Sequence, residues 1–109
     1  MIYQQNSKIF RLLSHPVRLQ ILDELRRGEA CVCHLQTLLH KPQAYVSQQL
    51  LSLREAGVVD STKDGLNVYY RVSDPLVIRI LEEVLGDAGE QVSLPGCPCP
   101  KCNRGCCSE

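Results

Sequence analysis

Residues 35–57, which read LQTLLHKPQAYVSQQLLSLREAG, decide the fold of this 109-residue chain. Apolar residues recur at helical spacing on both sides of Lys41-Pro42, a pair that ends one helix and begins the next. The pattern predicts helices over about 30–39 and 42–56, and Gly57 is a suitable residue to end the second. Two short helices joined by so tight a turn are typical of a helix-turn-helix.

The outer face of the helix expected over 42–56 carries short or amide-bearing uncharged side chains. A solvated helix with no binding role more often carries Lys and Glu there. Glutamine bonds adenine through two hydrogen bonds, and serine is versatile, so this face suits base edges in DNA. The candidate base contacts are Gln43, Ala44, Tyr45, Ser47, Gln48 and Gln49. The candidate phosphate contacts are Lys41, Arg54 and Lys63, with Arg18 as a further one.

The rest of the chain completes one recognisable architecture. Helices are expected over 2–14, 16–27 and 75–85. Two strands rich in β-branched and aromatic residues, 58–62 and 67–72, flank a turn that contains Asp64-Gly65. The sequence therefore predicts a mainly α fold with a β-hairpin wing. This is a winged helix-turn-helix of five helices plus two strands, in which the hairpin lies along the DNA backbone or minor groove.

Charge is unevenly distributed along a chain whose net charge is zero. Residues 1–72 carry nine Lys and Arg against six Asp and Glu, whereas residues 73–109 carry three against six. A mildly basic body is compatible with DNA binding, because local charge is what meets phosphate. No apolar run is long enough for a membrane span, and the N-terminus lacks an export signal. We therefore expect a cytoplasmic protein that binds neither a membrane nor a small organic substrate.

Apolar stripes on the first and last helices predict a homodimer. A helical chain of this length often completes its small core by dimerising. The stripe on the last helix is wide, which favours a dimer interface over a purely intramolecular core. The candidate interface residues are Ile9, Phe10, Leu13, Leu76, Val77, Ile80, Leu81 and Val84.

Seven cysteines in so short a chain form two separate groups. Cys31 and Cys33 belong to the third expected helix, and five more follow in a segment too rich in proline and glycine for regular structure: Cys97, Cys99, Cys102, Cys106 and Cys107. The expected division is a DNA-binding and dimerisation domain over 1–88 and a cysteine-rich metal-binding tail over 89–109. Three or four thiolates select soft ions, namely Cd(II), Pb(II) and As(III), with Zn(II) and Cu(I) also in range.

Four stretches together resemble the ArsR/SmtB repressors: 15–22 (HPVRLQIL), 30–35 (ACVCHL), 46–59 (VSQQLLSLREAGVV) and 65–72. The resemblance covers about residues 8–85. It implies a homodimer joined by the first and last helices. It also implies an operator with two-fold symmetry, which the protein binds without inducer and releases when the inducer binds.

The resemblance also bears on the cysteines. The family pattern Glu-Leu-Cys-Val-Cys-Asp-Leu appears here as Glu29 to Leu35, with both cysteines kept and His34 in place of the acid. Arsenite sensors of the family have a third cysteine where this chain has Gln36. Some cadmium and lead sensors instead add cysteines from a terminal segment, often of the partner subunit. By this comparison Cys31 and Cys33 are the strongest ligand candidates, followed by Cys99 and Cys102.

The two third-helix thiols also suggest a mechanism. Residues i and i+2 of a helix point about 200° apart, so both thiols can hold one ion only if the first helical turn distorts. That distortion would shift the population of molecules away from the DNA-binding state. His34 is open to two interpretations, as a further ligand or as a solvated surface residue. The family's second metal site, on the last helix, needs histidine, and this helix has none.

Other interpretations of the cysteines remain open. The tail cysteines could close around one zinc ion by themselves or act as a metal buffer. The DNA-binding fold could also carry a thiol redox or persulfide switch, which needs only two well-placed cysteines. An enzyme is not expected, because the single Cys-x-x-Cys, at 99–102, does not lie at a strand-to-helix junction, and no phosphate loop is present.

Overall fold

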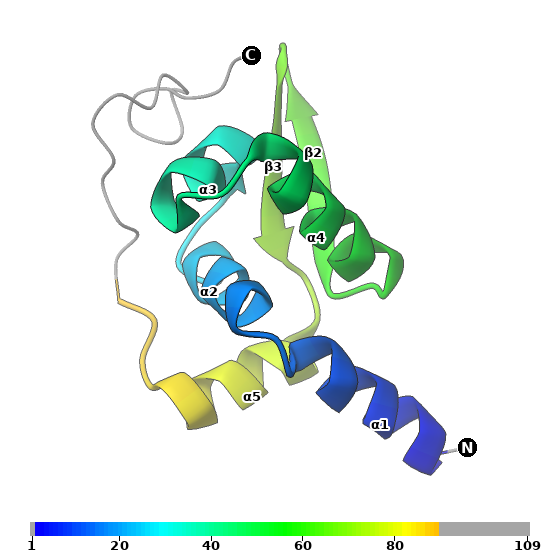
Figure 1. Cartoon of the computed structure of the whole chain (residues 1–109). Helices are drawn as coiled ribbons and strands as arrows, with labels where there is room; N and C mark the ends of the chain where they lie inside the picture. Colours follow the sequence, from blue (N-terminus) through cyan, green and yellow to red (C-terminus); the bar gives the residue numbers. More distant parts are fainter. Residues whose placement is uncertain (1, 90–109) are drawn as a thin grey trace.

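A computed structural model describes residues 2–89 of the chain (Figure 1). The expected helices and hairpin are present, and a short additional strand precedes the third helix. In chain order the elements are α1 (Ile2–Leu13), α2 (Pro16–Leu25), β1 (Ala30–Cys31), α3 (Val32–Leu39), α4 (Gln43–Glu55), β2 (Val59–Asp64), β3 (Asn67–Val72) and α5 (Pro75–Leu85). The cysteine-rich segment expected over 89–109 lies outside the described residues except for residue 89.

Local chemistry explains where α2 and α5 begin and where α3 ends. Pro16 and Pro75 occupy first-turn positions, where their fixed φ and missing N–H cost nothing. Asp74 caps α5, because its side chain accepts a hydrogen bond from the Leu76 N–H at 2.9 Å. His40 ends α3 in the left-handed region, with φ of 57°, and its N–H bonds to Gln36.

The three strands form one antiparallel sheet in the order β1-β3-β2. β2 and β3 make the expected hairpin, whose turn has Gly65 at a φ of +67° that favours glycine. β1 pairs with β3 through Ala30 opposite Tyr70 and Cys31 opposite Tyr69. The prediction that 30–39 is all helix was therefore wrong at its first two residues, because their backbone hydrogen-bonds to β3 instead of continuing the helical ladder.

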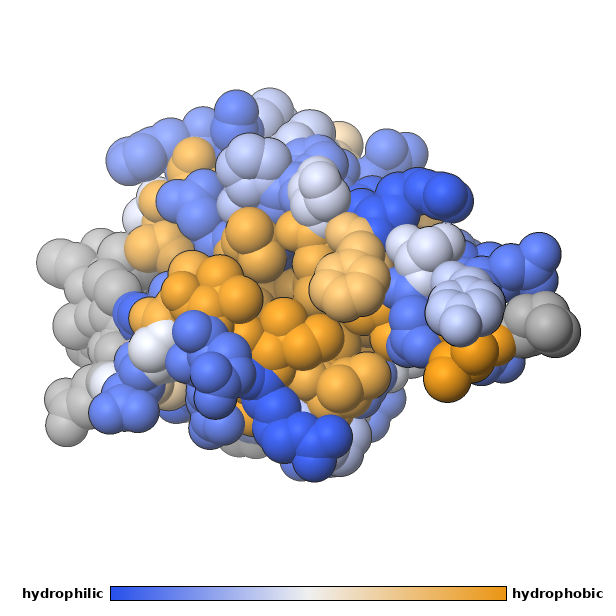
Figure 2. Space-filling model, turned by 90° about the horizontal axis from the view of Figure 1, so that it is seen from below, coloured by the Kyte–Doolittle hydropathy of each residue, from blue (hydrophilic) through white to orange (hydrophobic). Residues whose placement is uncertain are grey.

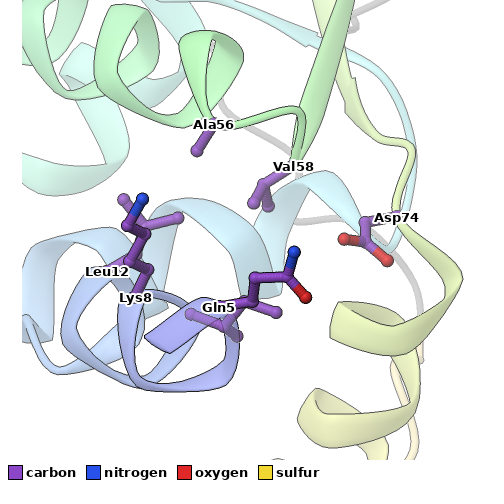
Figure 3. A pocket seen from close by; sticks show the side chains of 7 residues that line it. Gln5, Lys8, Leu12, Ala56, Val58 and Asp74 are labelled. Carbon is purple, nitrogen blue, oxygen red and sulfur yellow. The ribbon is translucent and has the colours of Figure 1, made fainter. Parts of the chain in front are cut away.

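The core lies between α2, α3, α4, the base of the hairpin and one side of α5. Ile21, Leu22, Leu35, Leu50 and Leu53 are all at most 1% exposed there. α1 extends away from this body (Figure 1) and buries only Leu13. A groove of about 340 Å³ separates α1 from the α4–β2 turn and the start of α5, with Gln5, Lys8 and Leu12 on one wall and Ala56, Val58 and Asp74 opposite (Figure 3).

None of the helices within residues 2–89 has the length and apolar character that crossing a membrane requires.

Candidate nucleic-acid interface and sensor cysteines

A three-residue turn, His40–Pro42, fixes α4 against α3. Lys41 N–H bonds back to the Gln36 carbonyl at 3.3 Å, and Pro42 takes the N-cap position of α4 in extended conformation. Val46, Leu50 and Leu53 are at most 1% exposed and anchor one side of α4 in the core. With that side fixed, helical periodicity determines which residues of α4 face away from the body.

The opposite side of α4 carries the expected polar residues. Gln43, Ala44, Ser47 and Gln48 are exposed. Tyr45 is half-buried, and the Lys41 ammonium lies 5.6 Å from the centre of its ring. An exposed, uncharged helical face is thereby presented on a rigid element, as an α-helix that enters the major groove requires.

Gln49 occupies a different position from the other polar residues of α4. It is half-buried, and its amide Oε1 accepts a hydrogen bond from Nε of Arg18 at 2.8 Å. The contact joins the first turn of α2 to the flank of α4. Gln49 is therefore joined to α2 by this bond, whereas the sequence prediction grouped it with the outward base contacts.

Of the four basic residues expected to meet phosphate, Arg18 is half-buried and the other three are exposed. Lys41, Arg54 and Lys63 are all exposed, at the turn before α4, in its last turn and on the hairpin respectively. The hairpin extends beyond the body (Figure 1), and Leu66 at its tip is 99% exposed. This geometry fits a wing that lies against a nucleic-acid backbone beside α4.

Cys31 and Cys33 lie on the two sides of the β1–α3 junction. Cys31 is 2% exposed and forms the N-cap of α3, with an extended φ of −95°. Cys33 is half-buried in the first turn, and neither cysteine forms a disulfide within residues 2–89. The prediction that both thiols are held on one helix needs correction, because Cys31 is fixed in the sheet by its pairing with Tyr69.

The donor set at this junction is incomplete for a metal ion. Over the described part of the chain, no three His, Cys, Asp or Glu side chains are grouped so that they could hold one. Two thiols fit part of a soft-metal site, and further thiolates are needed to complete it. Cys97, Cys99, Cys102, Cys106 and Cys107, the proposed source, lie outside the described residues.

His34 forms a buried contact that sequence reasoning missed. Its Nε2 lies 2.7 Å from Oε2 of Glu24, and the two side chains are 1% and 2% exposed. Glu24 also lies 3.8 Å from the Arg27 guanidinium. The interpretation of His34 as a surface histidine was therefore wrong. The only sign of this contact in the sequence was Glu24, an acidic residue at a core position of α2 between Ile21 and Leu25.

An apolar face covers α1 and α5. Figure 2 shows it as a continuous hydrophobic area on the side of the molecule where these helices lie. Phe10 and Val84 are 65% and 68% exposed, and Leu76 is 37% exposed. Ile9 and Ile80, on the same two helices, are half-buried and pack against the core. Such a continuous exposed apolar area marks an interaction surface.

Three of the expected interface residues belong instead to the protomer's own core. Leu13, Val77 and Leu81 are 7%, 0% and 1% exposed, so they support the apolar face from below and do not form its surface. The stripe on α5 is wide because one side packs inward and the other faces outward. Ile2, Tyr3 and Leu85 are exposed apolar residues of α1 and α5 that the expected set omitted.

Comparison with known proteins places this geometry among transcription regulators. The family described as "Bacterial regulatory protein, arsR family" matches residues 15–61. Over 83 residues, 76% of this chain, the sequence is 40% identical to the HTH-type transcriptional repressor SmtB of Mycobacterium tuberculosis. Over 77 residues, 70% of the chain, it is 38% identical to the cadmium resistance transcriptional regulatory protein CadC of Listeria innocua. The matches span 62% and 65% of those relatives, less than two thirds of each.

A solved structure supports the same assignment. The homodimeric winged helix-turn-helix DNA-binding domain of Mb0332 from Mycobacterium bovis, described as a possible ArsR-family regulator, is similar to this chain with a TM-score of 0.70 and 30% identity. The match covers 77% of this chain and 78% of that one. The expected winged helix-turn-helix fold is confirmed.

Proposed function

Because the chain belongs to the arsR family of bacterial regulatory proteins, we propose that it is a transcriptional repressor. It binds an operator as a homodimer and releases it when cysteine thiolates capture a thiophilic metal or metalloid ion. The exposed face of α4 is the main support for the DNA-binding part of this proposal. Uncharged side chains there flank Gln48, with exposed cations at the turn before the helix, in its last turn and on the wing.

The apolar face of α1 and α5 supports the homodimer. Exposed Phe10 and Val84 would leave water on contact with a second copy, and burial of apolar surface contributes roughly 25 cal/mol per Å². A two-fold dimer presents two α4 helices to two half-sites, about 34–36 Å apart along the duplex. The homodimeric state of the Mb0332 domain, which shares this fold, favours the same arrangement.

The cysteines at the β1–α3 junction supply the proposed sensor. Cys31 and Cys33 contribute two thiolates, and the tail cysteines complete a site that favours Cd(II), Pb(II) or As(III), with Zn(II) in range. The similarity to a cadmium resistance regulator supports thiolate sensing. Because Cys31 is fixed in the sheet, we place the rearrangement that joint ligation requires in the first turn of α3.

The first turn of α3 is also where the signal would pass to the DNA-binding surface. His34 lies in that turn, and its buried contact with Glu24 holds α3 against α2. Because α3 carries the turn that fixes α4, a shift of α3 changes the orientation of the base-reading face. The state without metal keeps the Glu24–His34 contact and binds DNA, and the metal-bound state favours a different position of α3.

A binding experiment tests the DNA-binding part. Fluorescence anisotropy with the chain's own promoter fragment, with scrambled DNA of equal length as the control, should show tighter binding to the promoter by at least 10³-fold at physiological salt. DNase protection should then cover two half-sites related by two-fold symmetry. Equal affinity for the two DNAs would exclude an operator-specific repressor.

A further inference from the structure

Three cations surround a small hollow where α1 meets α2. Lys8, Arg11 and Arg18, together with Leu12, line a depression of about 160 Å³. Lys8 and Arg11 lie one turn apart on α1 and share a face. Lys8 and Leu12 also line the neighbouring apolar groove, in which Figure 3 shows both side chains. The hollow is thus the basic end of a larger depression beside α1.

Over the described part of the chain, no carboxylate forms an ion pair with these cations. Among residues 2–89, no acidic residue lines the hollow. Arg26 and Arg27, which follow directly after α2, are by contrast both paired with Asp23. Three neighbouring cations without a counter-charge favour an anionic ligand.

The Arg18 guanidinium is fixed in position within this hollow. Its Nε donates to Gln49 at 2.8 Å, and its Nη1 donates to the Leu12 carbonyl at 3.4 Å. These two bonds use two of the five N–H donors of a guanidinium, which leaves three for a ligand. A planar, pre-positioned guanidinium suits the paired oxygens of a phosphate group.

The contact with Gln49 places the hollow along one flank of α4. Residues Tyr45, Gln49 and Ser52 form a half-buried row on that flank, next to the exposed polar face. Arg54 lies roughly 140° around the helix from Gln49, on the other flank. A helix of 10–12 Å diameter fills a major groove about 12 Å wide, so one phosphodiester backbone runs along each flank.

We propose that Lys8, Arg11 and Arg18 form a phosphate-binding site for the operator backbone that passes the Gln49 flank of α4. The site extends the DNA interface from the helix-turn-helix onto α1. It rests on the proposed function, because its ligand is the operator. The recognised chemistry is a phosphate group, which operator DNA or free inorganic phosphate can supply.

The salt dependence of DNA binding tests this site. Lys8→Gln and Arg11→Gln should each weaken binding to promoter and scrambled DNA by a similar factor, about 3- to 10-fold. Each lost phosphate contact should make the negative slope of log K against log [salt] shallower by about 0.9, hence by about twice that for a dimer. Arg79→Gln, which removes an exposed charge on α5, is the matched control and should leave affinity and slope unchanged.

Two further results separate the possible outcomes. Replacement of chloride by inorganic phosphate at equal ionic strength should not displace the promoter further, since the site favours a phosphate held in the duplex. Unchanged slopes in both variants, with wild-type promoter specificity intact, would overturn the site and leave the repressor function standing. Loss of promoter preference in wild type, with shallower slopes in both variants, would overturn the repressor function and leave Lys8, Arg11 and Arg18 as a site for DNA phosphate of any sequence.

Discussion

The imidazole of His34 and the carboxylate of Glu24 meet at 2.7 Å inside the protein, and both side chains are at most 2% exposed. His34 lies directly after the two candidate sensor cysteines, and Glu24 lies on the neighbouring helix α2. The contact therefore ties the first turn of α3 to the body. A buried polar group that loses its hydrogen-bond partner destabilises the fold, because nothing then compensates for its removal from water.

The buried pair should be necessary for stability. Glu24→Ala leaves a buried imidazole without its carboxylate and should lower the free energy of unfolding by about 1–3 kcal/mol. Glu24→Gln retains a hydrogen-bonding group and should cost less. Urea denaturation at fixed protein concentration measures both, and Glu82→Gln, on the exposed side of α5, is the control. Equal stability of Glu24→Ala and wild type would show that the contact contributes nothing.

The half-buried sensor cysteine should be needed for induction and not for DNA binding. Cys33→Ser should keep promoter affinity within about twofold, because Cys33 is on α3, whereas the base-reading residues are on α4. Added Cd(II) should then no longer release the DNA. Anisotropy reports both properties, and thermal unfolding checks that the variant is folded. If Cys33→Ser already fails to bind the promoter, the residue has a structural role.

The tail should contribute ligands without supporting the fold. Deletion of residues 94–109 removes five thiols and should weaken Cd(II) affinity by at least tenfold, because two thiolates alone make an incomplete site. Competition with a chromophoric chelator measures the affinity, and circular dichroism with urea denaturation monitors the body. An unaltered Cd(II) affinity would separate the tail from the sensor.

The apolar face should hold the dimer together. Val84→Glu places a charge on a 68% exposed position of α5 and should convert the dimer to monomer at micromolar concentration. Sedimentation velocity measures the change. Leu66→Glu, at the tip of the wing, makes the same chemical change on a 99% exposed residue and should remain dimeric. Dissociation of both variants, or of neither, would place the interface elsewhere.

Gln48 should read sequence and not merely add affinity. Gln48→Ala should cost about 1–3 kcal/mol of discrimination between the promoter and a promoter changed at the contacted base pair. Gln20→Ala, an exposed glutamine on α2, should have no effect. Competition anisotropy against the two DNAs gives the difference. A uniform loss of affinity on all sequences would contradict the base-reading role.

Strong local signals made most of the fold predictable. Periodicity and the Lys41-Pro42 break located α3 and α4 to within a few residues, and Asp64-Gly65 located the turn of the hairpin. β1 was missed because two residues carry no pattern of their own. These residues form a strand only because β3 lies beside them. That pairing is a tertiary contact, which the local sequence does not encode.

The site was predictable only where exposure follows from helical periodicity. Gln43, Ser47 and Gln48 are exposed as expected, whereas Gln49 is held by Arg18, a partner 31 residues away. The apolar stripe on α5 could not show which of its two sides packs inward, so Val77 and Leu81 were assigned to the wrong side. Long-range contacts decided each of these positions.

The most direct test of the account is an anaerobic titration of the reduced full chain, bound to its own promoter fragment, with Cd(II), Pb(II), As(III) and Zn(II). Anisotropy reports release of the DNA, and ultraviolet thiolate-to-metal absorption reports ligation by cysteine. We predict that at least one thiophilic ion releases the DNA as the absorption saturates. If every ion binds through thiolates and the promoter stays bound, metal sensing is contradicted, and a thiol redox or persulfide switch becomes the better description of Cys31 and Cys33.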